Sequence, residues 1–237
     1  MAKQFKFKEF SVDQDRCAMK IGTDGVLLGA WSRVSHEPQS ILDIGAGTGV
    51  IALMLAQRSQ AEVIDGLEID TEAYEQCVSN FEKAPWGDRL FCYHASLLEF
   101  VEEIDDQYDL IVSNPPFYTE DFKSNNEQRD TARFSDAMPF EHLMYAVANL
   151  LSDTGKFAVV IPFKEEDKLI SLGQQYGLTP NSIMRVKGSP TAEIKRSFIE
   201  FSFQEEKLSE SELIIETSRH QYTEDYINLV KNFYLKM

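Results

Sequence analysis

The sequence of 237 residues has few cysteines, few basic residues and no long apolar run. Its three cysteines, Cys17, Cys77 and Cys92, form neither a CxxC pair nor a cluster with histidines. Because structural zinc sites and disulfide frameworks need such groupings, we expect reduced thiols and no metal. The apolar segments reach only strand length, well short of the roughly 20 residues of a membrane span. The first residues lack the apolar region of a secretory signal, so we expect a cytoplasmic protein with no membrane partner.

Positive charge is scarce, because 23 Lys and Arg residues face 39 Asp and Glu residues and leave a net charge of −16. Such a chain is not expected to bind nucleic acid generally, since phosphate contacts need a cationic surface. A local basic surface on an acidic body is still compatible with this composition. Residues 1–34 illustrate it, with six Lys or Arg against four acids and therefore a charge of +2.

Strand and helix patterns alternate through the middle of the chain, with no repeat and no low-complexity linker. Strands are predicted over 40–44, 63–69, 90–94, 108–113, 155–161, 183–186, 196–203 and 213–216, and helices over 50–58, 71–85, 139–151, 165–176 and 224–234. This alternation predicts a Rossmann-like α/β fold. We expect a mostly parallel seven-stranded sheet, helices on both faces and an antiparallel C-terminal strand pair. The chain forms one domain in this prediction, with 36–237 as core and 1–35 as a cap containing a helix near 25–33.

A glycine-rich turn follows the first predicted core strand. Gly45, Gly47 and Gly49 form a GxGxG pattern that opens the helix over 50–58. Glycines let the backbone approach a ligand closely, and a helix N-terminus offers unpaired N–H donors. The dinucleotide-binding pattern GxGxxG would need glycine where Val50 stands, which argues against a dehydrogenase.

An acidic residue ends the second core strand, in Glu68-Ile69-Asp70. Glu68 follows Gly49 by 19 residues, at a point where a carboxylate can accept hydrogen bonds from both hydroxyls of a ribose. Together with the glycine turn, this residue predicts a site for an adenosine-bearing ligand.

A second motif, Asn114-Pro115-Pro116-Phe117, follows the fourth core strand. It suits the methylation of an sp² amine, whose nitrogen is a poor nucleophile because its lone pair is delocalised. The Asn114 side-chain oxygen and the Pro115 carbonyl can accept the amine protons and favour the developing positive charge. Two prolines keep the turn stiff, and Phe117 can stack on a flat target.

With these two motifs the chain resembles class I methyltransferases of the Asn-Pro-Pro-Tyr/Phe type. The segments 17–31 (CAMKIGTDGVLLGAW), 52–58 (ALMLAQR) and 233–235 (FYL) narrow the match. They are similar to blocks of the bacterial tRNA1(Val) adenine-N6 methyltransferases, and the resemblance covers essentially the whole chain. It implies S-adenosyl-L-methionine as methyl donor and the adenine N6 on the 3′ side of the tRNA anticodon as target.

The resemblance also implies roles for individual residues. Thr23 and Asp24 help to close the donor pocket, Asp43 and Gly45 flank the methionine moiety, and Glu68 holds the ribose. Ile69 and Asn114 belong to the same pocket. Ser96 stands where such enzymes often carry an aspartate near the donor adenine, so only the location transfers. Either Phe117 or the next residue, Tyr118, stacks on the target.

Two pairs of basic residues are candidates for contact with the anticodon loop of tRNA, Arg129 with Arg133 and Lys195 with Arg196. Two alternative activities use a similar turn: guanine N2 methylation in ribosomal RNA and glutamine-amide methylation in proteins. Amide methyltransferases carry a helical substrate domain before the glycine loop, whereas only about 40 residues precede it here. A non-catalytic nucleotide-binding protein would not need Asn114. We expect a monomer or a weak dimer.

Overall fold

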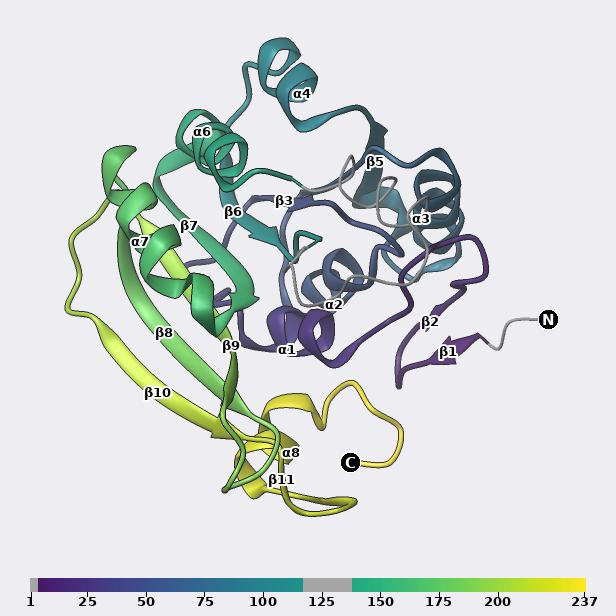
Figure 1. Cartoon of the computed structure of the whole chain (residues 1–237). Coiled ribbons are helices and arrows are strands. Elements are labelled where there is room, and N and C mark those ends of the chain that lie inside the picture. Colours follow the sequence, from purple (N-terminus) through teal and green to yellow (C-terminus); the bar gives the residue numbers. More distant parts are fainter. Residues whose placement is uncertain (1–3, 117–137) are drawn as a thin grey trace, which may run out of the picture.

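The structure is a computed structural model of the chain, in which residues 4–116 and 138–237 are described. A twisted mixed sheet forms its centre, with helices on both faces (Figure 1). In the described part the sheet has eight strands, in the spatial order β10 (Ser209–Ile214), β8 (Thr179–Lys187), β9 (Ile194–Ser202), β7 (Leu151–Pro162), β6 (Tyr108–Ser113), β3 (Ser40–Ile44), β4 (Val63–Glu68) and β5 (Leu90–His94). The helices are α1 (Thr23–Trp31), α2 (Val50–Arg58), α3 (Thr71–Lys83), α4 (Leu97–Glu103), α6 (Phe140–Leu150), α7 (Glu166–Gln175) and α8 (Glu224–Val230).

Strand directions confirm the predicted mostly parallel sheet. β5, β4, β3, β6 and β7 are parallel neighbours, and β9 runs antiparallel between β7 and β8. The sheet has one strand more than the predicted seven, because β10 pairs in parallel with the outer side of β8. Chain order reverses between β3 and β6, and ligands of open α/β sheets bind at such a switch point.

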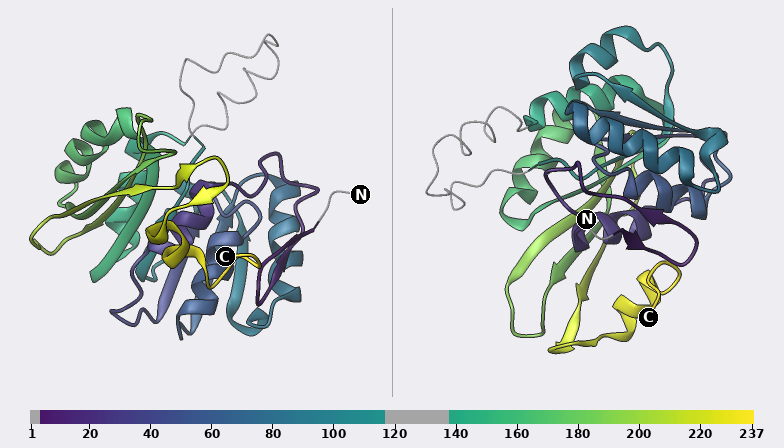
Figure 2. Two further views of the ribbon diagram at one scale, coloured as in Figure 1. Left: turned by 90° about the horizontal axis from the view of Figure 1, so that it is seen from below. Right: turned by 90° about the vertical axis from the view of Figure 1, so that its right-hand side faces the viewer.

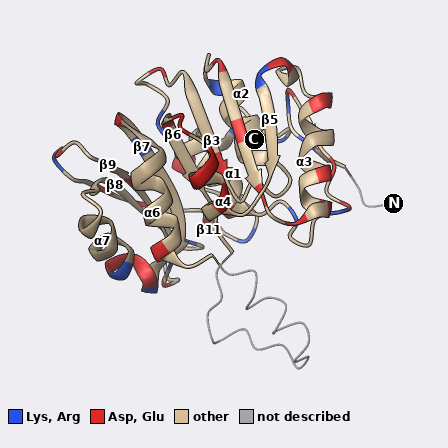
Figure 3. Cartoon of the chain, turned by 90° about the horizontal axis from the view of Figure 1, so that it is seen from above, with Lys and Arg blue, Asp and Glu red and all other residues tan. Residues whose placement is uncertain are grey.

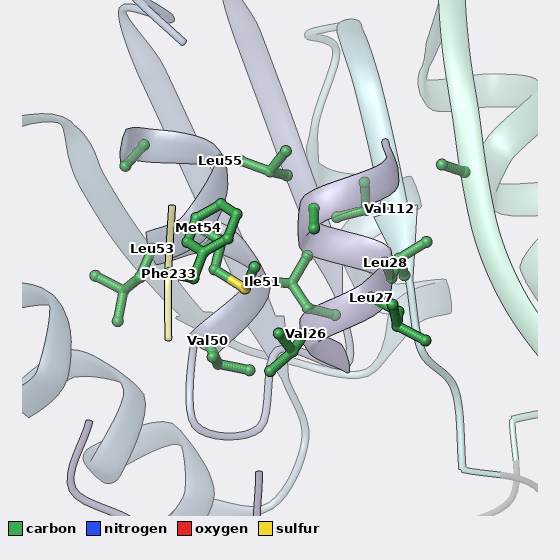
Figure 4. Close-up of a cluster of buried hydrophobic side chains, with 14 of the residues drawn as sticks. Val26, Leu27, Leu28, Val50, Ile51, Leu53, Met54, Leu55, Val112 and Phe233 are labelled. Carbon is green, nitrogen blue, oxygen red and sulfur yellow. The ribbon is translucent and has the colours of Figure 1, made fainter. Parts of the chain in front are cut away.

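Two apolar clusters fill the two faces of the sheet. Alternate residues of β3 contribute to each, with Ile41 on one face and Leu42 and Ile44 on the other. The first cluster packs under α1, α2, α3 and α8, and Figure 4 shows its centre, where Met54 lies among side chains of α1 and α2. The second cluster packs under α4, α6 and α7. Both faces are thus buried, as the apolar run over residues 110–112 of β6 requires.

Some local features differ from the sequence prediction. The helix α3 ends at Lys83, before the predicted end at residue 85, and Asp70 caps its start, because the Asp70 Oδ1 accepts a hydrogen bond from the Ala73 N–H at 2.8 Å. The helix α4 was not predicted. It begins after Ser96, and its seven residues are too few for a clear helical period.

The N-terminal and C-terminal segments lie together on the α1–α2 face (Figure 2). The short hairpin β1 (Phe5–Lys6) and β2 (Ser11–Val12) is followed by a strap that lies along α3. Phe7 forms an isolated bridge with Tyr234, and the Lys8 N–H donates to the Phe233 carbonyl at 2.9 Å. Beyond β10, the hairpin of β11 (Glu216–Ser218) and β12 (Gln221–Tyr222) leads into α8. Among the described helices, none is both long enough and apolar enough to cross a membrane.

Candidate active site

The two sequence motifs meet at the switch point of the sheet. Ile44, the last residue of β3, pairs with Ser113, the last residue of β6, and the Ser113 Oγ donates to the Ile44 carbonyl at 2.9 Å. The next residues are Gly45 and Asn114. Because both strands are parallel, the glycine loop and the Asn-Pro-Pro turn leave the sheet side by side at one edge, which we call the carboxyl edge.

The glycine loop forms an open cradle. Gly45 and Gly47 have φ angles of +75° and +57°, and a Cβ atom added at either would meet no other described atom within 4 Å. Gly49, with a φ of +76°, is needed for a different reason, since its added Cβ would lie 2.5 Å from the Phe81 ring. The loop is fixed by N–H groups of Gly45 and Ala46 that donate to the Leu67 carbonyl at 2.9 and 3.0 Å. Space for a ligand is therefore provided by backbone and not by flexible side chains.

Glu68 ties this loop to the end of β4. Its Oε2 accepts a hydrogen bond from the Gly47 N–H at 2.8 Å, while its Oε1 accepts from the N–H groups of Ile69 and Asp70, both at 2.9 Å. The carboxylate is therefore oriented beside the cradle, where the sequence predicted a ribose contact. Ile69 follows with its side chain 63% exposed, so an apolar surface borders the same place.

The carboxyl group of Asp43 is buried directly beneath the cradle. Its Oδ2 accepts from the Ala52 N–H at 3.2 Å, and its Oδ1 has no hydrogen-bond partner among the described residues. Burial raises the pKa of this carboxyl to about 7; the Ala52 hydrogen bond opposes the rise and the charge of Glu68 adds to it. An unpaired buried carboxylate oxygen favours a cationic ligand nearby, because such a group would stabilise the charged form.

The N-terminus of α1 closes the other side of the Asn114 turn. A Cβ atom added at Gly25 would lie 3.8 Å from the Asn114 Nδ2, so this helix packs against the turn at a residue without a side chain. Asp24 is held by Arg196, whose Nε lies 2.7 Å from the Asp24 Oδ2. Thr23 begins the same helix. Thr23 and Asp24 thus lie at the edge where the resemblance located them, and their contact with the donor stays a prediction.

The Asn-Pro-Pro turn is partly described. Asn114 and Pro116 are half-buried and Pro115 is buried. Phe117, Tyr118, Arg129 and Arg133 lie outside the described residues. Their predicted roles in stacking and RNA contact therefore stay predictions.

Ser96 has a structural role that the sequence analysis missed. It is the N-cap of α4, where its Oγ accepts from the Glu99 N–H at 3.3 Å and Glu99 Oε2 accepts from the Ser96 N–H at 3.0 Å. This reciprocal pair satisfies two N–H groups of the helix end. The spacing Ser-x-x-Glu was the signal that could have revealed the helix. A contact between Ser96 and the donor stays a prediction.

Other features of the described residues lie away from this site. A surface cavity of about 460 Å³ is lined by Lys8, Glu9, Gln57, Arg58 and Asn232. It lies at the C-terminal end of α2, and the glycine loop lies at the other end, so it is not the candidate site. No group of three or more His, Cys, Asp or Glu side chains within 4–116 and 138–237 is arranged to hold a metal ion.

The fold and this edge define a methyltransferase, as comparisons with known proteins show. The family model of the methyltransferase small domain matches residues 25–172. A tRNA1(Val) (adenine(37)-N6)-methyltransferase from Flavobacterium psychrophilum is 63% identical over 233 residues, which cover 98% of this chain and 100% of the relative. The chain therefore belongs to the tRNA1(Val) (adenine(37)-N6)-methyltransferase family.

Solved structures support the fold independently. A predicted O-methyltransferase from Agrobacterium tumefaciens superposes with a TM-score of 0.69 at 19% identity, covering 89% of this chain and 96% of that chain. The glycopeptide N-methyltransferase MtfA, solved with S-adenosyl-L-methionine, superposes with a TM-score of 0.55 at 12% identity, covering 78% and 100%. At these identities the likeness concerns the fold alone.

Proposed function

We propose that the protein transfers a methyl group from S-adenosyl-L-methionine to the N6 of the adenine next to the anticodon of tRNA1(Val). The observation that carries this proposal is the full-length 63% identity to a relative with that name. A tRNA substrate also supports a cytoplasmic location. The neighbouring positions of Gly45 and Asn114 support the same reaction, because they put the donor cradle beside the acceptor turn.

The cradle suits the donor in shape and charge. Gly45 and Gly47 leave open space, Glu68 supplies an oriented carboxylate for the ribose, and the unpaired Oδ1 of Asp43 favours a positive charge. S-adenosyl-L-methionine, when bound, supplies an electrophilic methyl group on a cationic sulfur. Ile69, exposed beside Glu68, offers an apolar contact to the adenine ring of the donor.

Asn114 and Pro115 act on the acceptor amine. Their oxygens accept hydrogen bonds from the two N6–H groups, which aligns the nitrogen and stabilises the positive charge that grows as its bond to the methyl carbon forms and the S–C bond of the donor breaks. The methylated nitrogen then loses one proton to water, so no strong base is required. The packing of α1 at Gly25 and the two prolines hold Asn114 in place before the substrate arrives.

The proposal is tested with tritiated donor and unmodified tRNA, followed by digestion of the product to nucleosides. We expect the label in N6-methyladenosine, and we expect it to be lost when the adenine next to the anticodon is replaced by guanine. Label in a methylated guanine would instead support ribosomal-type N2 methylation, and label in a protein glutamine would support amide methylation.

A further inference from the structure

The carboxyl edge continues beyond Asn114 into the outer strands, where an exposed ring lies beside two cations. Phe163 begins the turn η3 (Phe163–Glu165) directly after β7, and it is 39% exposed. Lys195 and Arg196 lie at the start of β9, with side chains 69% and 36% exposed. Pro162 pairs with Arg196, and η3 packs against β9. We call Phe163, Lys195 and Arg196 the wing edge.

Strand register places the wing edge beside the reaction site. Ser113 of β6 pairs with Val159 of β7, so Asn114 is level with Val160. Phe163 therefore lies three residues further along the strand direction than Asn114. At about 3.3 Å per residue, this puts Phe163 about 10 Å beyond Asn114 along the strand direction. Arg196 is connected more directly, through its ion pair with Asp24, the residue before Gly25.

The wing side carries cations that offset its acids. Arg185 pairs with Glu166 and Glu210, Lys187 with Glu212, and Arg196 with Asp24. From residue 181 to residue 197 the chain carries four cations and one acid, a charge of +3 in a protein of −16. These residues are Arg185, Lys187, Lys195, Arg196 and Glu193. The opposite side of Asn114 carries Asp43, Glu68 and Asp70, and α3 behind it carries three acids and one lysine. In Figure 3, red predominates on α3. A polyanion that reaches Asn114 therefore meets less repulsion from the wing side.

We propose that the wing edge binds the single-stranded nucleotides that flank the target adenine. Phe163 stacks on a neighbouring base, and Lys195 and Arg196 contact the phosphates on either side of it. Such pairing of an aromatic platform with cations is how proteins bind single-stranded nucleic acid. Arg196 is positioned by Asp24, whereas the carboxylate of Glu193 lies 3.8 Å from Lys195, so the ammonium can turn toward a phosphate. This proposal rests on the proposed function, since it assumes an RNA substrate.

The contribution of charge to tRNA binding is tested by comparing Lys195→Ala with the control variant Lys207→Ala. Lys207 is exposed and follows β9, so it lies in the same part of the sheet but at the opposite edge. We expect Lys195→Ala to raise the KM for tRNA several-fold and to lower the slope of log KM against log salt by about 0.7, the value for one phosphate contact on a single strand. Lys207→Ala should change neither, and donor affinity should be equal in both variants.

The stacking of Phe163 on a base is tested by comparing Phe163→Ala with the control variant Phe91→Ala. Phe91 is 48% exposed on β5, at the far side of the sheet. Loss of one base stack corresponds to a rise of roughly 5- to 150-fold in the KM for tRNA, with kcat largely kept. Phe163→Tyr should restore the wild-type value and Phe163→Leu should not, because only a ring can stack. Phe91→Ala should leave KM unchanged.

The outcomes separate this proposal from the proposed function. If the wild type forms N6-methyladenosine but Lys195→Ala and Phe163→Ala leave the KM for tRNA unchanged, the wing edge is not the RNA-binding surface. Equal KM increases in the two control variants would refute it as well. If the wild type forms no N6-methyladenosine, the proposed function itself fails.

Discussion

The carboxyl edge has two sides, the donor side with the glycine loop and the wing side with the wing edge. They differ in which groups interact with their acidic side chains. On the donor side, Asp43, Glu68 and Asp70 accept hydrogen bonds from backbone N–H groups, and none of them has an ion-pair partner in the described part of the chain. On the wing side the acids are paired with cations: Glu166 with Arg185, Glu212 with Lys187 and Asp24 with Arg196. The donor side thus keeps negative charge for a cationic ligand, while the wing side neutralises the charge that would repel RNA.

Asn114 lies between the two sides, and its removal should slow the reaction itself. We expect Asn114→Ala to lower kcat on the order of 100-fold or more, because a preorganised acceptor for the growing charge is lost. The KM for tRNA should change little, and a weaker Kd for the donor would agree with the predicted place of Asn114 in the donor pocket. Single-turnover rates at saturating tRNA, with calorimetry for the donor, measure this. Asn149→Ala on the exposed face of α6 is the control, and wild-type rates in Asn114→Ala would refute the role of the turn.

Arg185→Ala should break the pairing on the wing side. Its Nε and Nη2 lie 3.0 and 2.6 Å from the Glu166 Oε1, and the Glu166 side chain is 7% exposed. An unpaired buried carboxylate costs several kcal/mol, and partial exposure of Arg185 reduces this to about 2–3 kcal/mol in the free energy of unfolding. Urea unfolding measures the loss.

Donor affinity should be unchanged in Arg185→Ala, and a second change, Glu166→Gln, should recover part of the stability. A donor Kd that worsens with the stability would mean that the two sides are not independent.

The charge of Asp43 should make donor binding dependent on pH. Its pKa of about 7 means that the folded protein holds a proton there below neutrality, and the cationic donor favours the deprotonated form. Donor affinity should therefore rise with pH, by up to about tenfold per unit below pH 7, and level off above it. Calorimetry in buffers of different ionisation enthalpy should detect the released proton. Asp43→Asn should abolish the dependence, and an unchanged dependence in that variant would assign it to another group.

Ser96→Ala should have the smallest effect of these variants. It distinguishes a role of Ser96 in capping α4 from a role in donor binding. Loss of the capping box of α4 typically costs about 1 kcal/mol of stability. We expect that loss in thermal unfolding, together with unchanged donor affinity. A weaker donor Kd without a change in stability would instead place Ser96 in the pocket.

Much of the fold was predictable because local signals were strong. The apolar runs of β3 and β6 end at glycine and proline, so their bounds and the helix α2 were predicted as the structure has them. The meeting of Gly45 and Asn114 followed from parallel strands that end at one edge.

Other features depend on contacts between distant residues. The hydrophobic pattern of β10 or of β8 does not indicate that these two strands pair. The ion pair of Asp24 with Arg196 joins positions 172 residues apart. The approach of Gly25 to Asn114 likewise needs the packed helix α1. Sequence alone could place these residues on elements but could not bring them together.

The contacts between the two ends of the chain have a consequence for the order of assembly during synthesis. The Lys8 ammonium donates to the Lys231 carbonyl across 223 positions, and Phe7 bridges to Tyr234. Contacts over such a span form late in folding, because closing a long loop costs entropy. The N-terminus also leaves the ribosome first, so its C-terminal partners are made last. The hairpin of β1 and β2 therefore waits for α8, so a ribosome that stalls before the last turn leaves the aromatic rings around Phe7 exposed to chaperones and proteases.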